Sequence, residues 1–290
     1  MRATLRLRQS LQRHVLTAPS PLIRARGPTA AATALPASLE TDFAIIPDFF
    51  NATDARRLLE VALWKLDRSD PTRRKRSRRG AAAPAVAGTA DPAGDVPLQD
   101  LFSGNYGFEE GHFDSVIHDY RESLLTSLPP TAESSLAAIL SRLYSLVPSI
   151  PLIPNATLAD LPPKSSSTHV LHLAPHGAIL PHLDNLDAMG ETIVGASLGA
   201  PRVLRLEKEK GEDIGSGWDV YIPSGSVYIQ KGVVRYGYKH SILGYDHEGS
   251  VWEGKRLVPG HRVSFMVRVS ARNWVALTGQ DAPSKPMAAL

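Results

Sequence analysis

The spacing of apolar residues divides the chain into a helical part followed by a strand-like part. Between Asn51 and Leu66 apolar residues recur at helical spacing, and Asn51 or Thr53 is suited to cap this helix. Residues 113–128 and 132–147 show the same period and predict two further helices. A short apolar run at Phe43–Ile46 predicts a strand just before the first helix.

From Thr168 onward the period of the apolar residues changes to two. The alternating runs cover residues 168–174, 191–199, 202–208, 218–223, 225–231, 240–245 and 261–270, and turn-forming residues separate them. Several short strands at this spacing are typical of an antiparallel sandwich or barrel. We therefore expect an α+β fold in which N-terminal helices pack on a jelly-roll core.

Three segments are expected to lie outside the folded domain. Residues 1–39 hold six arginines and no acidic residue, which is typical of a mitochondrial transit peptide, although a basic tail would read similarly; we expect this segment to be disordered. Residues 69–97 are rich in Ala, Pro, Gly and charge and predict a disordered insertion. With residues 276–290 as a flexible tail, the folded domain is expected to span residues 40–275.

The charge of the chain is unevenly distributed. The formal charge is +3, but it falls to −3 without the arginines of residues 1–39 and to −9 without the six basic residues at 73–79. An acidic folded part argues against a broad nucleic-acid surface. For the basic run 73–79 a solvated loop, a nuclear-import signal and a local nucleic-acid arm all remain open.

Two absences narrow the possible chemistry. The sequence contains no cysteine, so disulfides, a thiolate nucleophile and cysteine-held metals are excluded, and any metal must be bound by His, Asp or Glu. No apolar run approaches the roughly 18 residues that a membrane-spanning helix requires, so we expect no stable membrane insertion.

His182 and Asp184 are two residues apart, after an apolar run. Residues i and i+2 of a strand face the same side, so both side chains can reach one metal ion. A third ligand must come from elsewhere, and His240 is best placed because it opens a predicted strand. His172, His247 and His261 are the less favourable alternatives. Two histidines and one carboxylate form the facial triad of non-haem Fe(II) oxygenases, although three such ligands also suit zinc.

Arg262 and Arg268 fall on one face of the last predicted strand. If that face points inward, two arginines are costly there unless they meet an anion. One of them can bind the far carboxylate of a keto acid that also coordinates the metal, because arginine holds carboxylates in a bidentate fashion.

Three stretches, residues 181–207, 225–246 and 260–270, resemble the AlkB family of Fe(II)- and 2-oxoglutarate-dependent dioxygenases, in particular its mitochondrial branch. The resemblance implies a double-stranded β-helix, a mitochondrial matrix location, Fe(II) and O₂ as reactants, and succinate and CO₂ as products. It further implies His182, Asp184 and His240 as iron ligands and catalytic residues, Arg262 as the partner of the distal carboxylate of 2-oxoglutarate, and Arg268 and Tyr228 as further co-substrate contacts.

The chain departs from the base-repairing members of this family. Leu171 and Leu173 occupy positions where those members carry polar co-substrate contacts, and residues 69–97 contain no aromatic residue to stack on a base. Rim candidates for base reading are Arg202, Arg205, Trp218, Arg235, Tyr236 and Tyr238, and we expect most of these to be core residues. The predicted substrate is a protein or an RNA, with protein ahead.

The sequence leaves two other functions open. One is a non-catalytic jelly-roll interaction protein with a structural metal pocket, and the other is a zinc-bound cupin-like enzyme. In each case we expect a monomer.

Overall fold

The computed structural model describes residues 12–27, 38–69, 98–102, 106–111, 115–151, 153–184, 190–211 and 213–269. The basic run 73–79, nearly all of the predicted insertion 69–97, and the predicted tail 276–290 lie outside these ranges. The helices are α1 (Ser38–Asp42), α2 (Ala52–Ser69), α4 (Ser135–Tyr144) and α5 (Gly232–Gly237), with 3₁₀ turns at Leu98–Leu101 and Leu158–Asp160. The strands are β1 (Ile23–Arg26), β2 (Phe43–Ile46), β3 (Ile117–Leu124), β4 (Ser166–His182), β5 (Ile193–Gly199), β6 (Arg202–Lys208), β7 (Gly217–Ile222), β8 (Ser226–Gln230), β9 (Tyr238–Ile242), β10 (Val251–Trp252), β11 (Lys255–Arg256) and β12 (Arg262–Val269).

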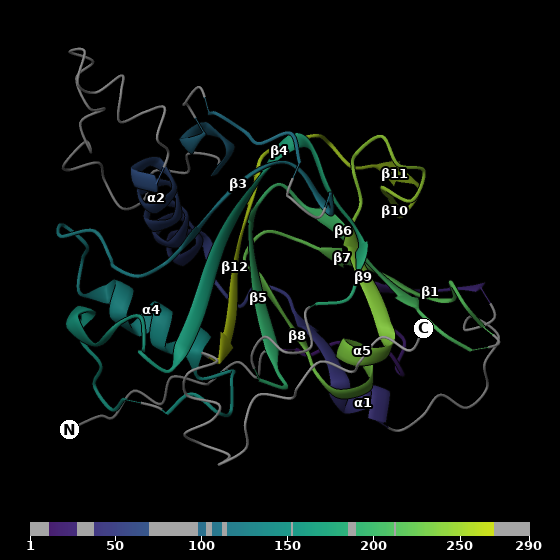
Figure 1. Ribbon diagram of the computed structural model, residues 1–290, viewed down its shortest axis with the longest axis horizontal. Coiled ribbons are helices and arrows are strands. Elements are labelled where there is room, and N and C mark those ends of the chain that lie inside the picture. Colours follow the sequence, from purple (N-terminus) through teal and green to yellow (C-terminus); the bar gives the residue numbers. More distant parts are fainter. Residues whose placement is uncertain are drawn as a thin grey trace, which may run out of the picture.

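A curled antiparallel sheet forms the body of the molecule (Figure 1). Its strands follow the order β1-β7-β6-β9-β4-β12-β5-β8-β2, and β3 also pairs with β4. The first half of β4 pairs with β12, whereas its last residues pair with β9. This long strand therefore runs through both halves of the sheet, and the α+β jelly roll predicted from the sequence is confirmed.

The two faces of the sheet bury different cores. Val263, Phe265 and Val267 of β12 pack on the face that α2 and α4 cover (Figure 1). Leu171, Leu173 and Tyr228 belong to the core inside the curl, where Arg262 also lies buried. The alternation predicted for β12 is confirmed, because its apolar residues face the helices while Arg262 faces the interior.

A buried arginine holds the bend of β4. Arg202 is fully buried, and its guanidinium donates to the carbonyls of Ala174 at 2.8 Å and Gly177 at 3.0 Å, with longer contacts to the carbonyls of Pro175, Leu243 and Gly260. A Cβ at Gly177 would lie 2.6 Å from the carbonyl oxygen of Asp119, so the bend also requires glycine. These contacts fix the direction in which the second half of β4 leaves toward His182.

Two of the three predicted helices are present, and one prediction is wrong. Residues 52–69 and 135–144 form α2 and α4, and Asn51 caps α2 by accepting a hydrogen bond from the Asp54 amide at 2.8 Å. Residues 117–124, predicted as helix, instead form β3. Pairing with β4 overrides the local pattern there, and an irregularity between His118 and Tyr120 interrupts the alternation of side chains.

The N-terminal part also differs from its prediction. Residues 12–27 were expected to be disordered together with the rest of residues 1–39, but they fold against the sheet and supply β1. Short stretches of mixed polar and apolar residues carry little periodic signal, so the pairing of β1 with β7 could not be read from the sequence. In the described residues, no helix is long and apolar enough to cross a membrane.

Candidate metal and co-substrate site

Neighbouring strands bring His182 and His240 together. His182 is the last residue of β4, and its cross-strand partner in β9 is His240, with 4.2 Å between the two ring centroids. The Nδ1–H of His182 donates to the carbonyl of Leu180 at 2.9 Å, which directs Nε2 toward the site. The pairing register therefore accounts for a histidine pair whose members are far apart in the sequence.

Asp184 completes a three-residue cluster. One ligand atom from each of His182, Asp184 and His240 lies within 4.8 Å of the others, and this is the group of possible metal ligands found in the described part of the chain. The sequence suggested that Asp184 lies on the same strand as His182. In the structure Asp184 instead follows the end of β4. Arg268 holds it, since Nη2 donates to Asp184 Oδ1 at 2.9 Å.

The electrostatics of the cluster favour a bound cation. Burial lowers the pKa of His240 to about 4, so at neutral pH its ring is uncharged and has a free lone pair. Burial alone would raise the pKa of Asp184, but the nearby His240 and Arg268 outweigh burial and the pKa lies below its usual value. A neutral imidazole beside an ionised carboxylate is the donor set that Fe(II) and zinc both accept.

Arg262 lies deeper in the curl and has an unsatisfied donor. Its side chain is 1% exposed, and Nε donates to Ser197 Oγ at 2.9 Å. Its Nη2 has no hydrogen-bond partner, and no carboxylate pairs with Arg262, within the residues that the structure describes. A buried guanidinium without an anion is costly, so this position is suited to a carboxylate ligand.

Tyr228 lies beside Arg262 and shares a hydrogen bond with it. Burial raises the pKa of the Tyr228 phenol, so this group stays protonated and can donate to an anion. A Cβ at Gly195 on the adjacent strand would come 2.2 Å from the tyrosine ring. Glycine at this position therefore makes room for the ring across β5.

The other candidate histidines lie elsewhere. His172 and His261 face the helix-covered side, where His172 Nε2 lies 3.1 Å from His261 Nδ1 within a cluster of aromatic rings. His247 lies in a loop and accepts a hydrogen bond from the Gly249 amide. The choice of His240 as the third member of the cluster thus agrees with the geometry.

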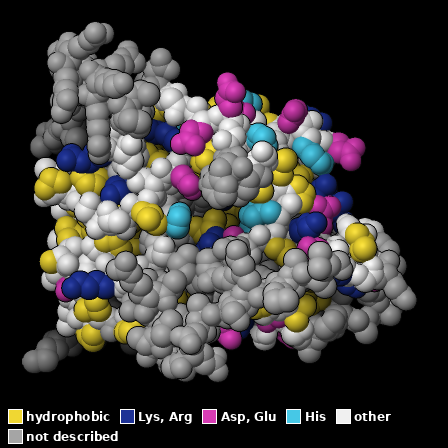
Figure 2. Space-filling model, viewed as in Figure 1, with side chains coloured by type: hydrophobic (Ala, Val, Ile, Leu, Met, Phe, Trp, Pro, Cys, Tyr) yellow, Lys and Arg dark blue, Asp and Glu magenta, His cyan; other side chains and the backbone are white. Residues whose placement is uncertain are grey.

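Ser197 and Gly195 could not be singled out from the sequence, because their roles depend on which strands pair. Arg235, near Asp184 on α5, was considered only as a rim residue. Of the other rim candidates, Trp218 and Arg202 are buried in the core and Arg205 pairs with Asp219. On the described part of the face in Figure 2, acidic, basic and histidine side chains are interspersed and form no continuous basic track.

The fold and site define a class: a jelly roll with a His-x-Asp…His cluster and a buried arginine on the last strand. No protein-family model matches the chain. It is 36% identical over 163 residues to a cattle (Bos taurus) protein named alpha-ketoglutarate-dependent dioxygenase alkB homolog 7, mitochondrial. It is 30% identical over 162 residues to the mouse (Mus musculus) protein of that name. The resemblance to AlkB-like 2-oxoglutarate dioxygenases is confirmed.

These alignments cover 56% of this chain and 65% of each relative, so the chain spans just under two thirds of their length. Among solved structures, OsALKBH1 gives a TM-score of 0.41 at 15% identity, over 78% of this chain and 97% of that chain. A Pseudomonas putida prolyl-4-hydroxylase gives a TM-score of 0.38 at 15% identity, over 79% of this chain and 92% of that chain. TM-scores this low support no conclusion, and the jelly-roll fold is assigned from the strand order alone.

Proposed function

We propose that the chain is a mitochondrial Fe(II)- and 2-oxoglutarate-dependent dioxygenase whose substrate is a protein. The observation that carries the proposal is the combination of the His182, Asp184 and His240 cluster with Arg262, a buried cation for which the described residues provide no carboxylate partner. A zinc hydrolase has no use for Arg262. In a purely structural pocket, burying the Arg262 guanidinium without a carboxylate partner would cost stability and bring no benefit. The names of the relatives support the same class.

Different residues would bind the metal and the co-substrate. His182, Asp184 and His240 would hold the metal, and Arg268 keeps the Asp184 carboxylate oriented toward it. Arg262 and Tyr228 would bind the distal carboxylate of 2-oxoglutarate. When bound, Fe(II) supplies the activation of O₂ that couples oxidation of 2-oxoglutarate to succinate and CO₂ with oxidation of the substrate.

The surface around the site favours a protein over a nucleic acid as substrate. Two apolar side chains lie close in sequence to the ligands and are exposed: Leu180 at 45% and Tyr236 at 41%. The described residues contribute no aromatic and basic hairpin of the kind that reads a flipped base. Leu173 is the cross-strand partner of Arg262, so an apolar residue stands where base-repairing members carry a polar one.

The arginine-rich start of the sequence and the names of the relatives support a mitochondrial location, with the matrix as the proposed compartment. The state of the protein in solution is proposed to be monomeric.

The test is anaerobic addition of Fe(II) and 2-oxoglutarate to the purified protein. We expect a weak visible charge-transfer band, and succinate release once O₂ and a mitochondrial protein extract are supplied. His182→Ala and His240→Ala should abolish the band, while His247→Ala serves as a matched loop control and should retain it. Full band intensity in His240→Ala would contradict the assigned cluster.

A second comparison separates the competing functions. The protein is exposed to equal concentrations of Fe(II) and Zn(II) in the presence of 2-oxoglutarate, and both bound metal and succinate release are measured. Succinate release should depend on iron. Metal binding without succinate release, on protein extract and on methylated RNA alike, would favour the non-catalytic alternative. Turnover on RNA alone would refute the choice of a protein substrate.

A further inference from the structure

The segment 12–27 connects the two outer strands of the sheet. His14 forms a β-bridge with Ile45 of β2, with reciprocal backbone hydrogen bonds of 2.9 Å. Nine residues later β1 begins, and it pairs with β7 from Ile23↔Val220 to Arg26↔Gly217. β1 and β2 are the two ends of the strand order, and without β1 the end next to it would be β7. The segment therefore links the two edges of the sheet, and we call residues 13–26 the closing segment.

Apolar side chains of the closing segment enter the interior core. Leu16 is 5% exposed and belongs to the same cluster as Leu171 and Tyr228. Leu22 and Ile23 pack against that cluster as well. The segment therefore contributes to the core that surrounds the co-substrate site.

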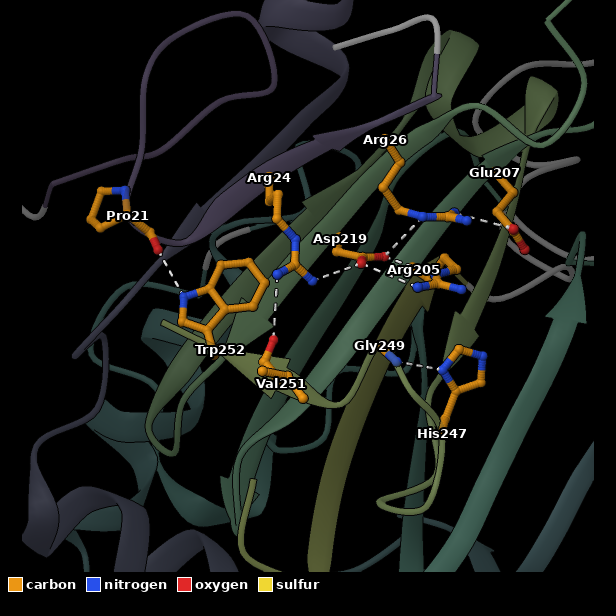
Figure 3. Close-up of polar contacts among 10 residues, drawn as sticks. All are labelled: Pro21, Arg24, Arg26, Arg205, Glu207, Asp219, His247, Gly249, Val251 and Trp252. Carbon is orange, nitrogen blue, oxygen red and sulfur yellow. Dashed lines mark hydrogen bonds and ion pairs between the residues drawn. The ribbon is translucent and has the colours of Figure 1, made fainter. Parts of the chain in front are cut away.

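Charged side chains anchor β1 to the rest of the sheet (Figure 3). Asp219 of β7, whose side chain is 3% exposed, receives Arg24 at 3.0 Å, Arg26 at 3.7 Å and Arg205 at 2.8 Å. Arg26 also pairs with Glu207 at 3.2 Å. Two of the arginines that make the N-terminus look like a transit peptide are thus used as partners of acidic residues in the folded sheet.

The short hairpin of β10 and β11 adds further contacts. Trp252 Nε1 donates to the carbonyl of Pro21 at 2.9 Å, and the guanidinium of Arg24 lies 4.9 Å from the centre of a Trp252 ring (Figure 3). Removal of the closing segment would expose Trp252 and leave the backbone of β7 as an open edge. Among the described residues, Arg205 would then be the remaining ion-pair partner of Asp219.

We propose that the closing segment is kept in the mature protein and that the import signal is confined to residues 1–12. Those residues still hold three arginines, at positions 2, 6 and 8, and no acid. A processing protease would hydrolyse one peptide bond before His14, with water as co-reactant, and release the short N-terminal peptide. This replaces a transit peptide of 39 residues, and it does not depend on the proposed dioxygenase activity.

Two variants with the same loss of charge separate the two roles. Arg6→Ala with Arg8→Ala alters the proposed signal, and Arg24→Ala with Arg26→Ala alters the closing segment, each in the full chain. We expect the first pair to reduce import into isolated mitochondria several-fold and to leave the melting temperature of the recombinant protein unchanged. The second pair should import normally but melt about 3–8 °C lower, because ion pairs with a buried carboxylate are lost.

The mature N-terminus should also be determined from wild-type protein recovered from mitochondria. A terminus between residues 9 and 14, which removes all three of these arginines, supports the proposal. A terminus at residue 24 or beyond overturns it, and so does an intact Met1, which would mean that no bond is cleaved. Unchanged melting of the Arg24 and Arg26 variant would show that the closing segment does not stabilise the fold.

Discussion

The guanidinium of Arg262 is enclosed by the sheet, with Ser197 and Tyr228 as neighbours and one nitrogen unsatisfied. Arg262→Gln should therefore weaken 2-oxoglutarate binding and leave metal binding nearly unchanged. A charge-assisted hydrogen bond contributes roughly 1.5–3 kcal/mol, which corresponds to an affinity loss of about 10- to 150-fold. Calorimetric titration measures it, with Arg256→Gln as the control because Arg256 is exposed and bonds to the backbone carbonyls of Tyr245 and His247. Wild-type affinity in Arg262→Gln would assign this residue another task.

His172 makes stability depend on acidity. Burial, together with the nearby charge of Arg121, lowers the pKa of His172 to about 2, and Arg121 Nε donates to its Nδ1 at 2.9 Å. In the unfolded chain a histidine titrates near pH 6.5. Between these two pH values the unfolded chain binds more protons than the folded chain. The contribution of His172 to the free energy of unfolding is therefore fully present above about pH 6.5 and decreases as the pH falls.

The expected loss of unfolding free energy from His172 is about 1.4 kcal/mol per pH unit, or about 2 kcal/mol at pH 5 relative to pH 7. Urea unfolding at several pH values measures it. His172→Gln should be less stable at pH 7, since Arg121 loses its ring acceptor, but its stability should depend less on pH by this amount. Parallel pH profiles of the two proteins would refute the assignment.

At the scale of elements, the bend of β4 has a single fully buried arginine at its centre. Arg202→Met removes the donors to the Ala174 and Gly177 carbonyls and the contact with the Tyr245 ring, whose centre is 3.8 Å away. We expect a loss of about 2–4 kcal/mol of unfolding free energy, because buried carbonyls lose their partners. Metal affinity should fall too, since the bend directs His182.

Arg205→Met is a control on the same strand, because its ion pair with Asp219 lies on the sheet away from the bend. It should lower stability without changing metal affinity. Denaturant unfolding and metal titration of both variants provide the comparison. Equal loss of metal affinity in the two variants would show that general destabilisation, rather than the bend, is responsible.

Elements with a strong period were predictable, and elements that depend on pairing were not. The seven alternating runs became β4 to β9 and β12. α4 lies within its predicted range, whereas α2 covers the predicted helix and continues to Ser69. The chain at 117–124 carries buried Arg121 and a left-handed Asp119, which produce a pattern unlike that of a regular strand. Its pairing with β4, like that of β1 with β7, depends on residues far away in the sequence.

For the site, spacing pointed to His182, Asp184 and His240 because ligand types and strand alternation are local properties. Whether they bind iron, and whether Arg262, Arg268 and Tyr228 bind the co-substrate, stay predictions. Ser197 and Gly195 could not be found, since a small residue becomes informative only when its cross-strand neighbour is known. The bond between Arg268 and Asp184 was missed for the same reason.

At the scale of the whole molecule, charge outside residues 1–39 and the run 73–79 is −9. Any binding of single-stranded RNA should therefore come from that run. Replacing its six basic residues with serine should abolish salt-dependent RNA binding, for which each neutralised phosphate contributes about −0.7 to the slope of log affinity against log salt. Fluorescence anisotropy at salt concentrations from about 50 to about 200 mM measures this slope. Succinate release should be unaffected by the change; an unaltered slope would locate RNA binding on the folded domain.

β4 pairs with β12, a strand formed by residues much later in the sequence. Asp184, which follows β4, accepts a hydrogen bond from Arg268, 84 residues further on, and β12 pairs along most of the first half of β4. Chains dominated by such distant contacts fold slowly, in milliseconds to seconds. The metal cluster cannot be complete before the chain has been synthesised through His240, and the hydrogen bond that holds Asp184 also requires Arg268. A chain that folds slowly remains extended long enough to pass through a translocation pore. We therefore expect the ion to be acquired in the compartment where the chain finally folds.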